Sequence, residues 1–366
     1  MRILYCNLRP KWAVKGHIYF DAKWVHLLSD LAEVTLLCYE NEWYENISDN
    51  IHKEVCDVVS KIDKEWVSWK VWSKGQLKRL GIKDHAESNL YIKRVIELSR
   101  KNQYDYIIIA TLDMISYYIY RKQLRKTGKM VLIVHSIDDL RNGIINKIFV
   151  KVKNDFKYIV MEEEGSDYLS EIYDIDKSRI YFIPHMSNPV TSAIDTNIDD
   201  YDIVGISNSN DDNEVKKIIC LDKYEHFFER NGLRAILRSM NIEYSSTGLK
   251  VFRGRLGLSY DEYYTYISKA RLILLPFSDH FGLRTSGTIM DAFSQGIPIL
   301  GNCFKTMEQY SRQVPNICKI YSTMEEFKKY TLQLVERTDK YDEEYQLFQD
   351  NHSDIFIIHQ MKKLFR

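Results

Sequence analysis

A short run of small and charged residues, RTSGTIMD, has the composition of a phosphate-binding site. Ser286, Gly287 and Thr288 stand directly before apolar residues that predict a helix, so their backbone N–H groups would lie in its first turn. Such groups, with the positive end of the helix dipole, suit a phosphate or diphosphate. Arg284 could bind phosphate oxygens, and Asp291 could accept hydrogen bonds from a sugar diol. The alternative is an ordinary surface pair between Arg284 and Asp291, with Ser286 only capping the helix.

The flanking residues predict the elements that would position this run. Leu272–Leu275 is a short apolar stretch ended by Pro276, as expected of a strand buried on both faces of a parallel sheet. Gly296 and Pro298 end the helix, and the next strand begins at Ile299. The helix N-terminus would therefore follow the carboxyl end of a buried strand, where open α/β sheets bind their ligands.

The segment Pro276–Pro298 resembles the donor-binding motif of GT-B glycosyltransferases, especially the retaining, family 4-like group with two glutamates separated by seven residues. The matching residues, in order, are Pro276-Phe277-Ser278, Gly282, Asp291-Ala292 and Gly296-Ile297-Pro298. The resemblance implies that Asp291 replaces the second glutamate and holds the nucleotide ribose, with Ser286–Thr288 along the diphosphate. Leu283, not an acid, stands at the first glutamate position. Asp279, which lies at a different position in the loop, is the candidate for that acidic, catalytic role.

Two arginines that precede this segment in the chain are candidates for the same site. Lys250–Phe252 predicts a strand, and Arg253 and Arg255 lie at its exit. Many relatives hold the phosphates with an arginine and a lysine after the first strand of this domain, whereas Ser207–Asn213 carries neither. That departure leaves the phosphates to Arg284 and these two arginines. The resemblance places Arg255 beside the base; solvated surface charge is the alternative.

The first half of the chain supplies two more candidates. Gly16 lies in a loop between a predicted strand, Ile3–Cys6, and a predicted helix, His17–Ser29. No GxGxxG or Walker sequence is present, and in GT-B enzymes the equivalent glycine loop faces the donor sugar. His135 follows the apolar run Met130–Val134, and a histidine at the end of a buried strand can contact substrate. The resemblance gives His135 a catalytic contact with the transferred sugar. Ordinary turn roles are the alternatives for both residues.

These elements predict an α/β protein of two Rossmann-like, doubly wound domains facing a cleft, the GT-B architecture. We expect the N-terminal, acceptor-side domain to span residues 1–186 and the nucleotide-sugar domain residues 187–345. Residues 346–366 should form a helix that crosses back to the first domain. Within the second domain, Gly232–Asn241 is predicted as a helix.

Composition excludes several classes of protein. The 366 residues include 51 basic and 51 acidic side chains, so nothing global favours a nucleic acid partner. Six cysteines without a CxxC pair predict reduced thiols in a cytoplasmic protein. Neither a signal peptide nor a run of about 18 apolar residues is evident.

One basic segment, Lys61–Lys83, points to the inner face of a membrane. Trp66, Trp69 and Trp72 are spaced three residues apart among an excess of lysines. A basic helix with a tryptophan stripe can lie in the membrane interface, which would suit a lipid-linked acceptor. Packing of these aromatics on the domain core is the alternative.

Two acidic triplets match the DxD pattern of metal-dependent transferases of another fold. Asp174-Ile175-Asp176 and Asp200-Tyr201-Asp202 do not directly follow a convincing buried strand, so we predict capping and loop roles for them. No HExxH or paired Cys/His spacing suggests a metal.

We therefore expect a glycosyltransferase of the hexosyltransferase type. It would move a sugar from a UDP- or GDP-type donor, with no metal or other cofactor, to a glycan or lipid-linked acceptor in bacterial-type surface polysaccharide synthesis. Retention at the anomeric carbon follows from the resemblance alone. A nucleotide-sugar epimerase on the same fold and a non-catalytic binding protein are the alternatives.

Overall fold

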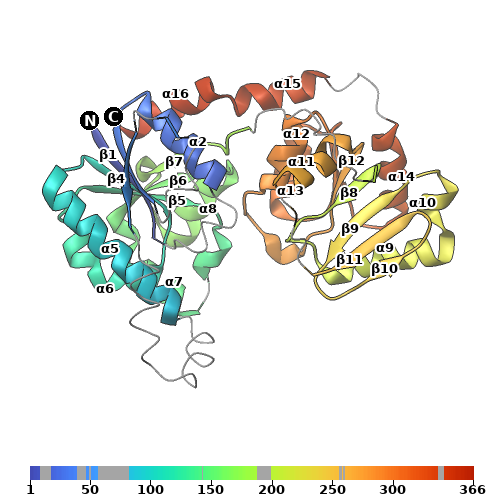
Figure 1. Cartoon of the computed structure of the whole chain (residues 1–366), viewed down its shortest axis with the longest axis horizontal. Helices are drawn as coiled ribbons and strands as arrows, with labels where there is room; N and C mark the ends of the chain where they lie inside the picture. Colours follow the sequence, from blue (N-terminus) through green and yellow to red (C-terminus); the bar gives the residue numbers. More distant parts are fainter. Residues whose placement is uncertain are drawn as a thin grey trace. The chain divides into compact units, whose positions relative to one another are not determined.

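The computed structural model describes residues 1–8, 18–38, 47–48, 51–56, 82–141, 143–187, 199–254, 258, 260–336 and 342–366. Gly16, Arg255 and Lys61–Gly81 lie outside these residues, so their predicted roles stay predictions. The described residues form two α/β units, each built on a seven-stranded sheet (Figure 1). The predicted pair of Rossmann-like domains is confirmed.

The first unit consists of Met1–Pro184 and Asp354–Arg366. Its sheet is parallel throughout, in the order β3-β2-β1-β4-β5-β6-β7. The strands are β1 (Arg2–Asn7), β2 (Glu33–Cys38), β3 (His52–Val55), β4 (Tyr106–Thr111), β5 (Lys129–Val134), β6 (Phe156–Val160) and β7 (Ile180–Phe182). The helices are α2 (Ile18–Ser29), α5 (Ile82–Asn102), α6 (Met114–Leu124), η2 (Asp138–Arg141), α7 (Gly143–Val152), η3 (Lys153–Asp155), α8 (Glu164–Tyr173), η4 (Lys177–Arg179) and α16 (Asp354–Leu364).

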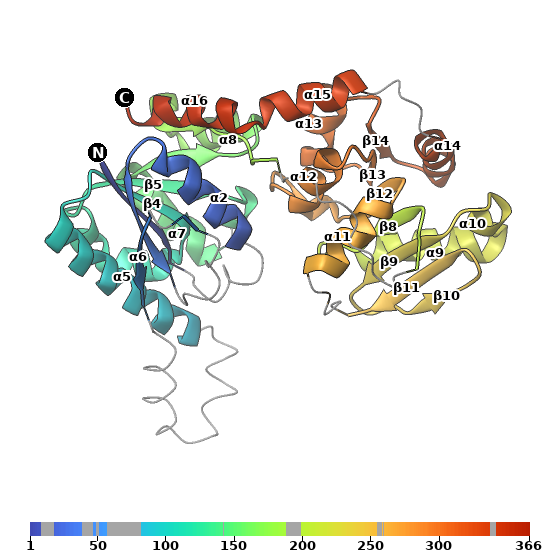
Figure 2. The same ribbon diagram turned by 45° about the horizontal axis from the view of Figure 1, so that its top comes forward.

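The C-terminal helix α16 packs within this first unit, against α2 and β7 (Figures 1 and 2). Lys157 Nζ on β6 donates a 2.7 Å hydrogen bond to the carbonyl oxygen of Leu364. Just beyond the helix, the ring of Phe365 meets that of Tyr106 edge-on, with centroids 5.0 Å apart. Strand β6 and the core of the sheet therefore hold the end of the chain.

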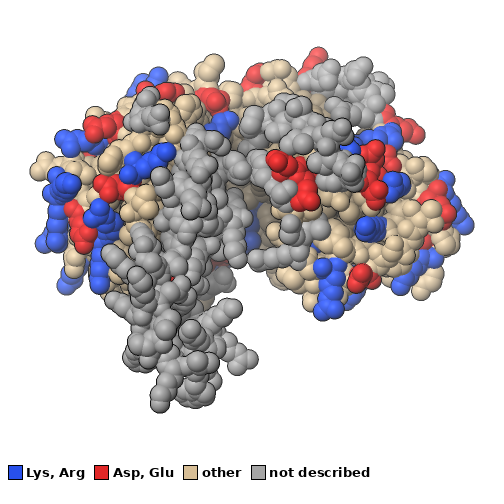
Figure 3. Space-filling view, viewed as in Figure 1, with Lys and Arg blue, Asp and Glu red and all other residues tan. Residues whose placement is uncertain are grey.

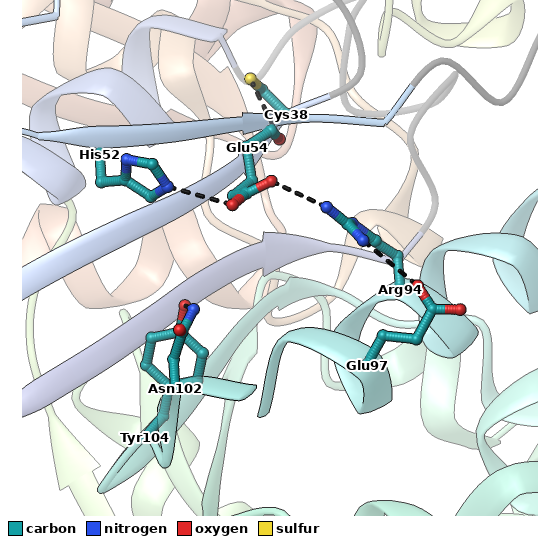
Figure 4. A network of polar contacts seen from close by, with 7 residues as sticks. All are labelled: Cys38, His52, Glu54, Arg94, Glu97, Asn102 and Tyr104. Carbon is teal, nitrogen blue, oxygen red and sulfur yellow. Dashed lines mark hydrogen bonds and ion pairs between the residues drawn. The ribbon is translucent and has the colours of Figure 1, made fainter. Parts of the chain in front are cut away.

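The edge strand β3 was not expected from the sequence, because HKEV has no apolar run. Figure 4 shows how side chains fasten it: Glu54 accepts hydrogen bonds from Arg94 on α5 (2.9 Å) and pairs with His52 (3.1 Å). Burial of Glu54 opposes its ionisation, but hydrogen bonds from His52 and Arg94 and the arginine charge lower its pKa overall. A short, polar strand is typical of a sheet edge.

The second unit, His185–Ser353, has the strand order β10-β11-β9-β8-β12-β13-β14. Only β10 is antiparallel to its neighbour among the described strands. The strands are β8 (Ile203–Gly205), β9 (Ala235–Ser239), β10 (Tyr244–Ser245), β11 (Leu249–Arg253), β12 (Leu272–Leu275), β13 (Ile299–Asn302) and β14 (Cys318–Tyr321). The helices are α9 (Asp212–Glu225), α10 (Phe227–Arg230), α11 (Tyr260–Lys269), η5 (Asp279–Phe281), α12 (Gly287–Ser294), α13 (Lys305–Gln313), α14 (Met324–Val335) and α15 (Asp342–Asn351).

The helix predicted over Gly232–Asn241 is wrong, because Ala235–Ser239 forms β9. All five residues of this strand are buried. A strand buried on both faces shows no alternation, so its apolar residues can be read as a helical face.

Both connections between the units are tied to one histidine of the second unit. The first crossover follows Pro184 and the second follows Ser353, so residues 346–353 belong to the second unit and not to the terminal helix. The backbone N–H of Ser187 donates to the carbonyl oxygen of His352 (3.2 Å), and His352 Nδ1 lies 2.5 Å from the carbonyl oxygen of His185. The start and the end of the unit are therefore held together.

Among the described residues, none of the helices is long and apolar enough to cross a membrane. On the face shown in Figure 3, Lys and Arg side chains are interspersed with Asp and Glu side chains over both units. This mixture agrees with the balanced composition of the chain.

Candidate functional site

The strand order of the second unit reverses between β8 and β12. The chain leaves β8 towards β9 on one side and later returns to β12 on the other side of β8. Loops at the carboxyl ends of two such strands diverge, and doubly wound sheets bind their ligands in the resulting crevice. Here Asn210, after β8, pairs with Phe277, after β12, in an isolated antiparallel bridge. The Asp211 N–H also donates to the carbonyl oxygen of Pro276 (2.7 Å).

A buried arginine braces the loops around this switch point. Arg238 on β9 is 1% exposed and donates hydrogen bonds to the carbonyl oxygens of Gly254 (2.8 Å) and Ser207 (3.2 Å). The Asn210 amide donates to the carbonyl oxygens of Gly205 (2.6 Å) and Arg238 (2.9 Å). The loop after β8 and the exit of β11 are thus fixed to each other. This brace could not be predicted from the sequence, because Arg238 lies in a segment that was predicted to be a helix.

A carboxylate fixes the start of α9 beside the end of β9. Asp212 accepts hydrogen bonds from the Ser239 hydroxyl (2.6 Å), the Met240 N–H (2.8 Å) and the Asn241 amide (2.7 Å). Burial opposes the charged form, but these hydrogen bonds outweigh it and lower the pKa of Asp212. Asp212 is therefore charged at neutral pH and has a structural role.

The loop after β12 begins with the turn η5. The Ser278 hydroxyl accepts a hydrogen bond from the His280 N–H (3.1 Å), and Asp279 stands exposed in the turn. Gly282 then adopts φ 60° and ψ −142°, a conformation that only glycine tolerates. Leu283 is 3% exposed. An apolar, buried side chain thus stands where the resemblance predicts the first acidic residue.

Arg284 follows, with its backbone fixed and its side chain half-buried. Its N–H donates to the Thr306 hydroxyl (3.2 Å), and that hydroxyl lies 3.0 Å from the Arg284 carbonyl oxygen. The guanidinium carbon is 5.4 Å from the centroid of the Phe281 ring, which is within cation–π distance. The guanidinium is thus placed at the carboxyl edge of the sheet. Arg253, at the end of β11, is exposed at the same edge.

The first turn of α12 has no side-chain cap. Ser286 occupies the N-cap position with extended backbone (φ −113°, ψ 115°), yet its hydroxyl makes no capping hydrogen bond. Gly287 is exposed, and a Cβ placed there would meet no atom within 4 Å. The capping role considered for Ser286 is therefore wrong. The helix therefore begins without a side-chain cap, and the space beside Gly287 is open.

Asp291 lies one turn further along the same helix and is 6% exposed. Its carboxylate accepts hydrogen bonds from the hydroxyls of Tyr264 (2.7 Å) and Tyr263 (2.9 Å), both on α11. Two tyrosines of the neighbouring helix therefore orient this buried carboxylate.

Two buried amides flank the same loop. The Asn302 amide on β13 donates to the carbonyl oxygen of Phe277 (2.5 Å), and Asn210 pairs with the same residue from the other side. Among the described residues, no donor reaches the Oδ1 atom of either asparagine. Both asparagines were missed from the sequence, where a single asparagine after a short strand carries no signal.

His135 lies in the first unit, directly after β5, and is half-buried. Its ring packs edge-on against Phe20 of α2, with centroids 5.0 Å apart. The next residue of α2, Asp21, is fully buried and accepts hydrogen bonds from Tyr5 (2.6 Å) and Asn7 (2.5 Å) of β1. These contacts fix α2, against which the His135 ring packs. Helix α2 follows β1, and the strand order of this sheet also reverses between β1 and β4.

The capping and loop roles predicted for the acidic triplets are confirmed. Asp176 accepts a hydrogen bond from the Ser178 N–H (2.8 Å) and caps η4. Asp202 accepts one from the Arg234 N–H (2.9 Å), and Asp200 pairs with Lys269 (3.0 Å).

The two sheets and their connections define a GT-B fold, the architecture shared by glycosyltransferases and UDP-N-acetylglucosamine 2-epimerases. Three solved structures illustrate the likeness. Sucrose-phosphate synthase from Thermosynechococcus elongatus is 11% identical with a TM-score of 0.64, over 100% of this chain and 98% of that one. UDP-GlcNAc 2-epimerase from Methanocaldococcus jannaschii is 12% identical with a TM-score of 0.61, over 99% of both chains. WaaG, a glycosyltransferase involved in lipopolysaccharide biosynthesis, is 10% identical with a TM-score of 0.56, over 99% of this chain and 98% of that one.

No family model matches the sequence, and no curated protein matches it either. At 10–12% identity, the solved structures establish the fold and not the reaction.

Proposed function

We propose that this chain is a glycosyltransferase of the hexosyltransferase type. It transfers a sugar, with retention, from a UDP- or GDP-type donor to a glycan or lipid-linked acceptor in surface polysaccharide synthesis. The observation that carries the proposal is the uncapped, open first turn of α12 at the switch point, one turn before the buried Asp291. An anion-binding turn and an oriented carboxylate on one helix match the diphosphate and ribose of a nucleotide.

In this proposal the second unit binds the donor. The N–H groups of Gly287 and Thr288 and the guanidinium of Arg284 receive the diphosphate, and Asp291 receives the ribose hydroxyls. The helix dipole contributes only about 0.3–2 kcal/mol, so the arginine charge is needed to stabilise the leaving diphosphate. Arg253 at the same edge adds a second positive charge.

Four further residues keep the roles that the resemblance implies. Asp279, exposed in η5, is the candidate carboxylate at the transferred sugar, and Gly16 and Arg255 are the candidate contacts with the sugar and the base. His135 is the candidate contact of the first unit with the transferred sugar. The segment Lys61–Lys83 is the candidate membrane contact that would bring the enzyme to a lipid-linked acceptor.

A calorimetric titration with UDP, GDP, TDP and ADP, with and without Mg²⁺, tests the donor site. We expect one of the uracil or guanine nucleotides to bind, with affinity independent of Mg²⁺. Failure of all four to bind would assign Pro276–Pro298 a structural role and remove the basis of the proposal.

An epimerase is the second candidate, because UDP-GlcNAc 2-epimerase from Methanocaldococcus jannaschii has the same fold over its whole length. An epimerase acts on the nucleotide sugar alone and exchanges a proton at a sugar carbon through acid and base groups. Incubation with UDP-GlcNAc in D₂O without acceptor separates the two functions. Deuterium at the sugar ring would indicate an epimerase, whereas a transferase leaves the ring unlabelled. Binding without either reaction would indicate a non-catalytic protein.

A further inference from the structure

Helices α6 and α7 of the first unit expose apolar and basic side chains together. Neither MISYYIYRKQL nor GIINKIFVKV contains an acidic residue. Four large apolar side chains are exposed on them: Tyr118 (41%), Ile119 (63%), Ile144 (63%) and Val150 (51%). Three lysines of the same helices, Lys122, Lys147 and Lys151, are also exposed, as is Lys126, two residues after α6. We call these eight residues the α6–α7 face.

The residues of the α6–α7 face belong to one surface. Helices α6 and α7 pack side by side, as both views of the ribbon show (Figures 1 and 2). Lys151 Nζ on α7 lies 5.8 Å from the centroid of the Tyr118 ring on α6. The opposite sides of the helices are buried, through Tyr117 on α6 and Phe149 on α7. Each helix therefore has a buried apolar side and an outer side that is unusually rich in aliphatic groups.

Three neighbouring cations already pair with acidic side chains. Arg121 and Arg125 pair with Asp155, whose carboxylate is 1% exposed, and Lys153 lies 3.6 Å from the Asp174 carboxylate. By contrast, the four lysines of the α6–α7 face enter no ion pair within the described parts of the chain. The face therefore carries net positive charge, although the whole chain is neutral.

We propose that the α6–α7 face docks on the surface of an anionic phospholipid bilayer. Lysines would lie against the negatively charged head groups, while Ile119, Ile144 and Val150 enter the boundary between head groups and acyl chains. A nucleic acid would use the lysines but leave the aliphatic side chains in water. A second copy of the chain would bring like charges together across a two-fold axis. An anionic lipid surface uses both kinds of side chain.

This docking surface differs from Lys61–Lys83 and does not depend on sugar transfer. Its direct test is co-sedimentation of the full chain with phosphatidylcholine vesicles that do or do not contain phosphatidylglycerol. We expect binding to the phosphatidylglycerol vesicles, weakened by salt, and much less binding to phosphatidylcholine alone. Loss of each lysine should lower the partition coefficient about fivefold.

The variants separate charge from apolar contact. Lys122→Glu/Lys147→Glu should abolish binding, and Ile119→Ser/Ile144→Ser should reduce it at every salt concentration. Two substitutions are matched controls because they alter exposed residues of the same types elsewhere: Lys216→Glu on α9 and Ile355→Ser on α16, where Ile355 is 83% exposed. Both controls should bind vesicles as the unchanged protein does.

Three results would overturn the proposal. The first is full binding by Lys122→Glu/Lys147→Glu, which would exclude these lysines from the contact. The second is equal binding to both kinds of vesicle, which would remove the role of lipid charge. The third is loss of binding in a Trp66→Ala/Trp69→Ala/Trp72→Ala variant while both α6–α7 variants still bind, which would assign membrane contact to Lys61–Lys83. Because every substituted residue of the α6–α7 face is exposed, unchanged thermal unfolding should show that these variants are folded.

Discussion

The hydroxyl of Tyr264 donates a 2.7 Å hydrogen bond to Oδ1 of Asp291, and both side chains are buried. Tyr264→Phe should lower the free energy of unfolding by about 1–3 kcal/mol, because the buried carboxylate loses a donor that water cannot readily replace. Tyr263→Phe is the matched control: Tyr263 bonds the other oxygen but is half-buried, so we expect a smaller loss. Urea unfolding of both variants measures the difference. Equal losses would show that the burial of the tyrosine does not decide how much its hydrogen bond contributes.

Gly287→Ala should weaken binding of the nucleoside diphosphate without harming the fold. A Cβ at this position meets no protein atom within 4 Å, so the substitution costs no packing. It would, however, stand where a phosphate approaches the first turn of α12. We expect at least a tenfold loss of affinity, about 1.4 kcal/mol, by calorimetry and an unchanged or higher melting temperature. Unchanged affinity would place the diphosphate elsewhere.

Arg284→Ala should also weaken binding of the nucleoside diphosphate by at least tenfold, about 1.4 kcal/mol, because it removes a positive charge from the phosphates. Arg284→Lys should recover only part of the loss, since an ammonium group cannot bind two oxygens in the same planar geometry. Arg234→Ala, which removes a half-exposed arginine at Asp199, is the control. Calorimetry with the nucleotide that the proposed titration selects measures all three affinities. An unaltered affinity in Arg284→Ala would exclude this residue from the site.

His135→Ala should reduce the rate of sugar transfer far more than it reduces nucleotide affinity. His135 belongs to the first unit, whereas Arg284, Gly287 and Asp291 belong to the second. The contact proposed for His135 is therefore with the transferred sugar and not with the nucleotide. The measurement compares kcat with the calorimetric affinity for the nucleoside diphosphate. Equal losses in both would make His135 a folding residue that supports α2 through Phe20.

The second unit should lose stability as the pH falls from about 6.5 to about 4. Burial lowers the pKa of His352 to about 4, although its hydrogen bond with the His185 carbonyl oxygen opposes the shift. In this pH window the unfolded chain binds a proton that the native protein excludes, so the free energy of unfolding decreases with acid and is unaffected above the window. The loss attributable to His352 is about 2–4 kcal/mol.

Thermal unfolding between pH 7 and pH 4 measures this effect. His352→Phe should flatten the dependence on pH, because an uncharged ring can still stack on Phe348, whose centroid lies 4.1 Å away. His359→Gln, at an exposed position on α16, is the control and should keep the slope of the unchanged protein. An identical slope in His352→Phe would assign the acid sensitivity to other groups.

The strands and helices that form the frame of the candidate site could be predicted from short patterns. Apolar runs such as Leu272–Leu275 and Met130–Val134 are buried strands because parallel sheets cover both of their faces. The small residues before Ile289 correctly predicted the start of α12. The same rule failed at Ala235–Ser239, since a fully buried strand and a buried helix share an apolar run.

Local sequence patterns were thus enough to predict the two-domain α/β architecture and the small-residue helix start at the candidate site. The support of that site became visible in the folded chain: Tyr263 and Tyr264 hold Asp291, and Arg238 braces Ser207. The difference lies in sequence separation. Helix starts and buried strands follow from neighbouring residues, whereas these hydrogen bonds join residues about 30 positions apart, which only the order of strands in the folded sheet brings together.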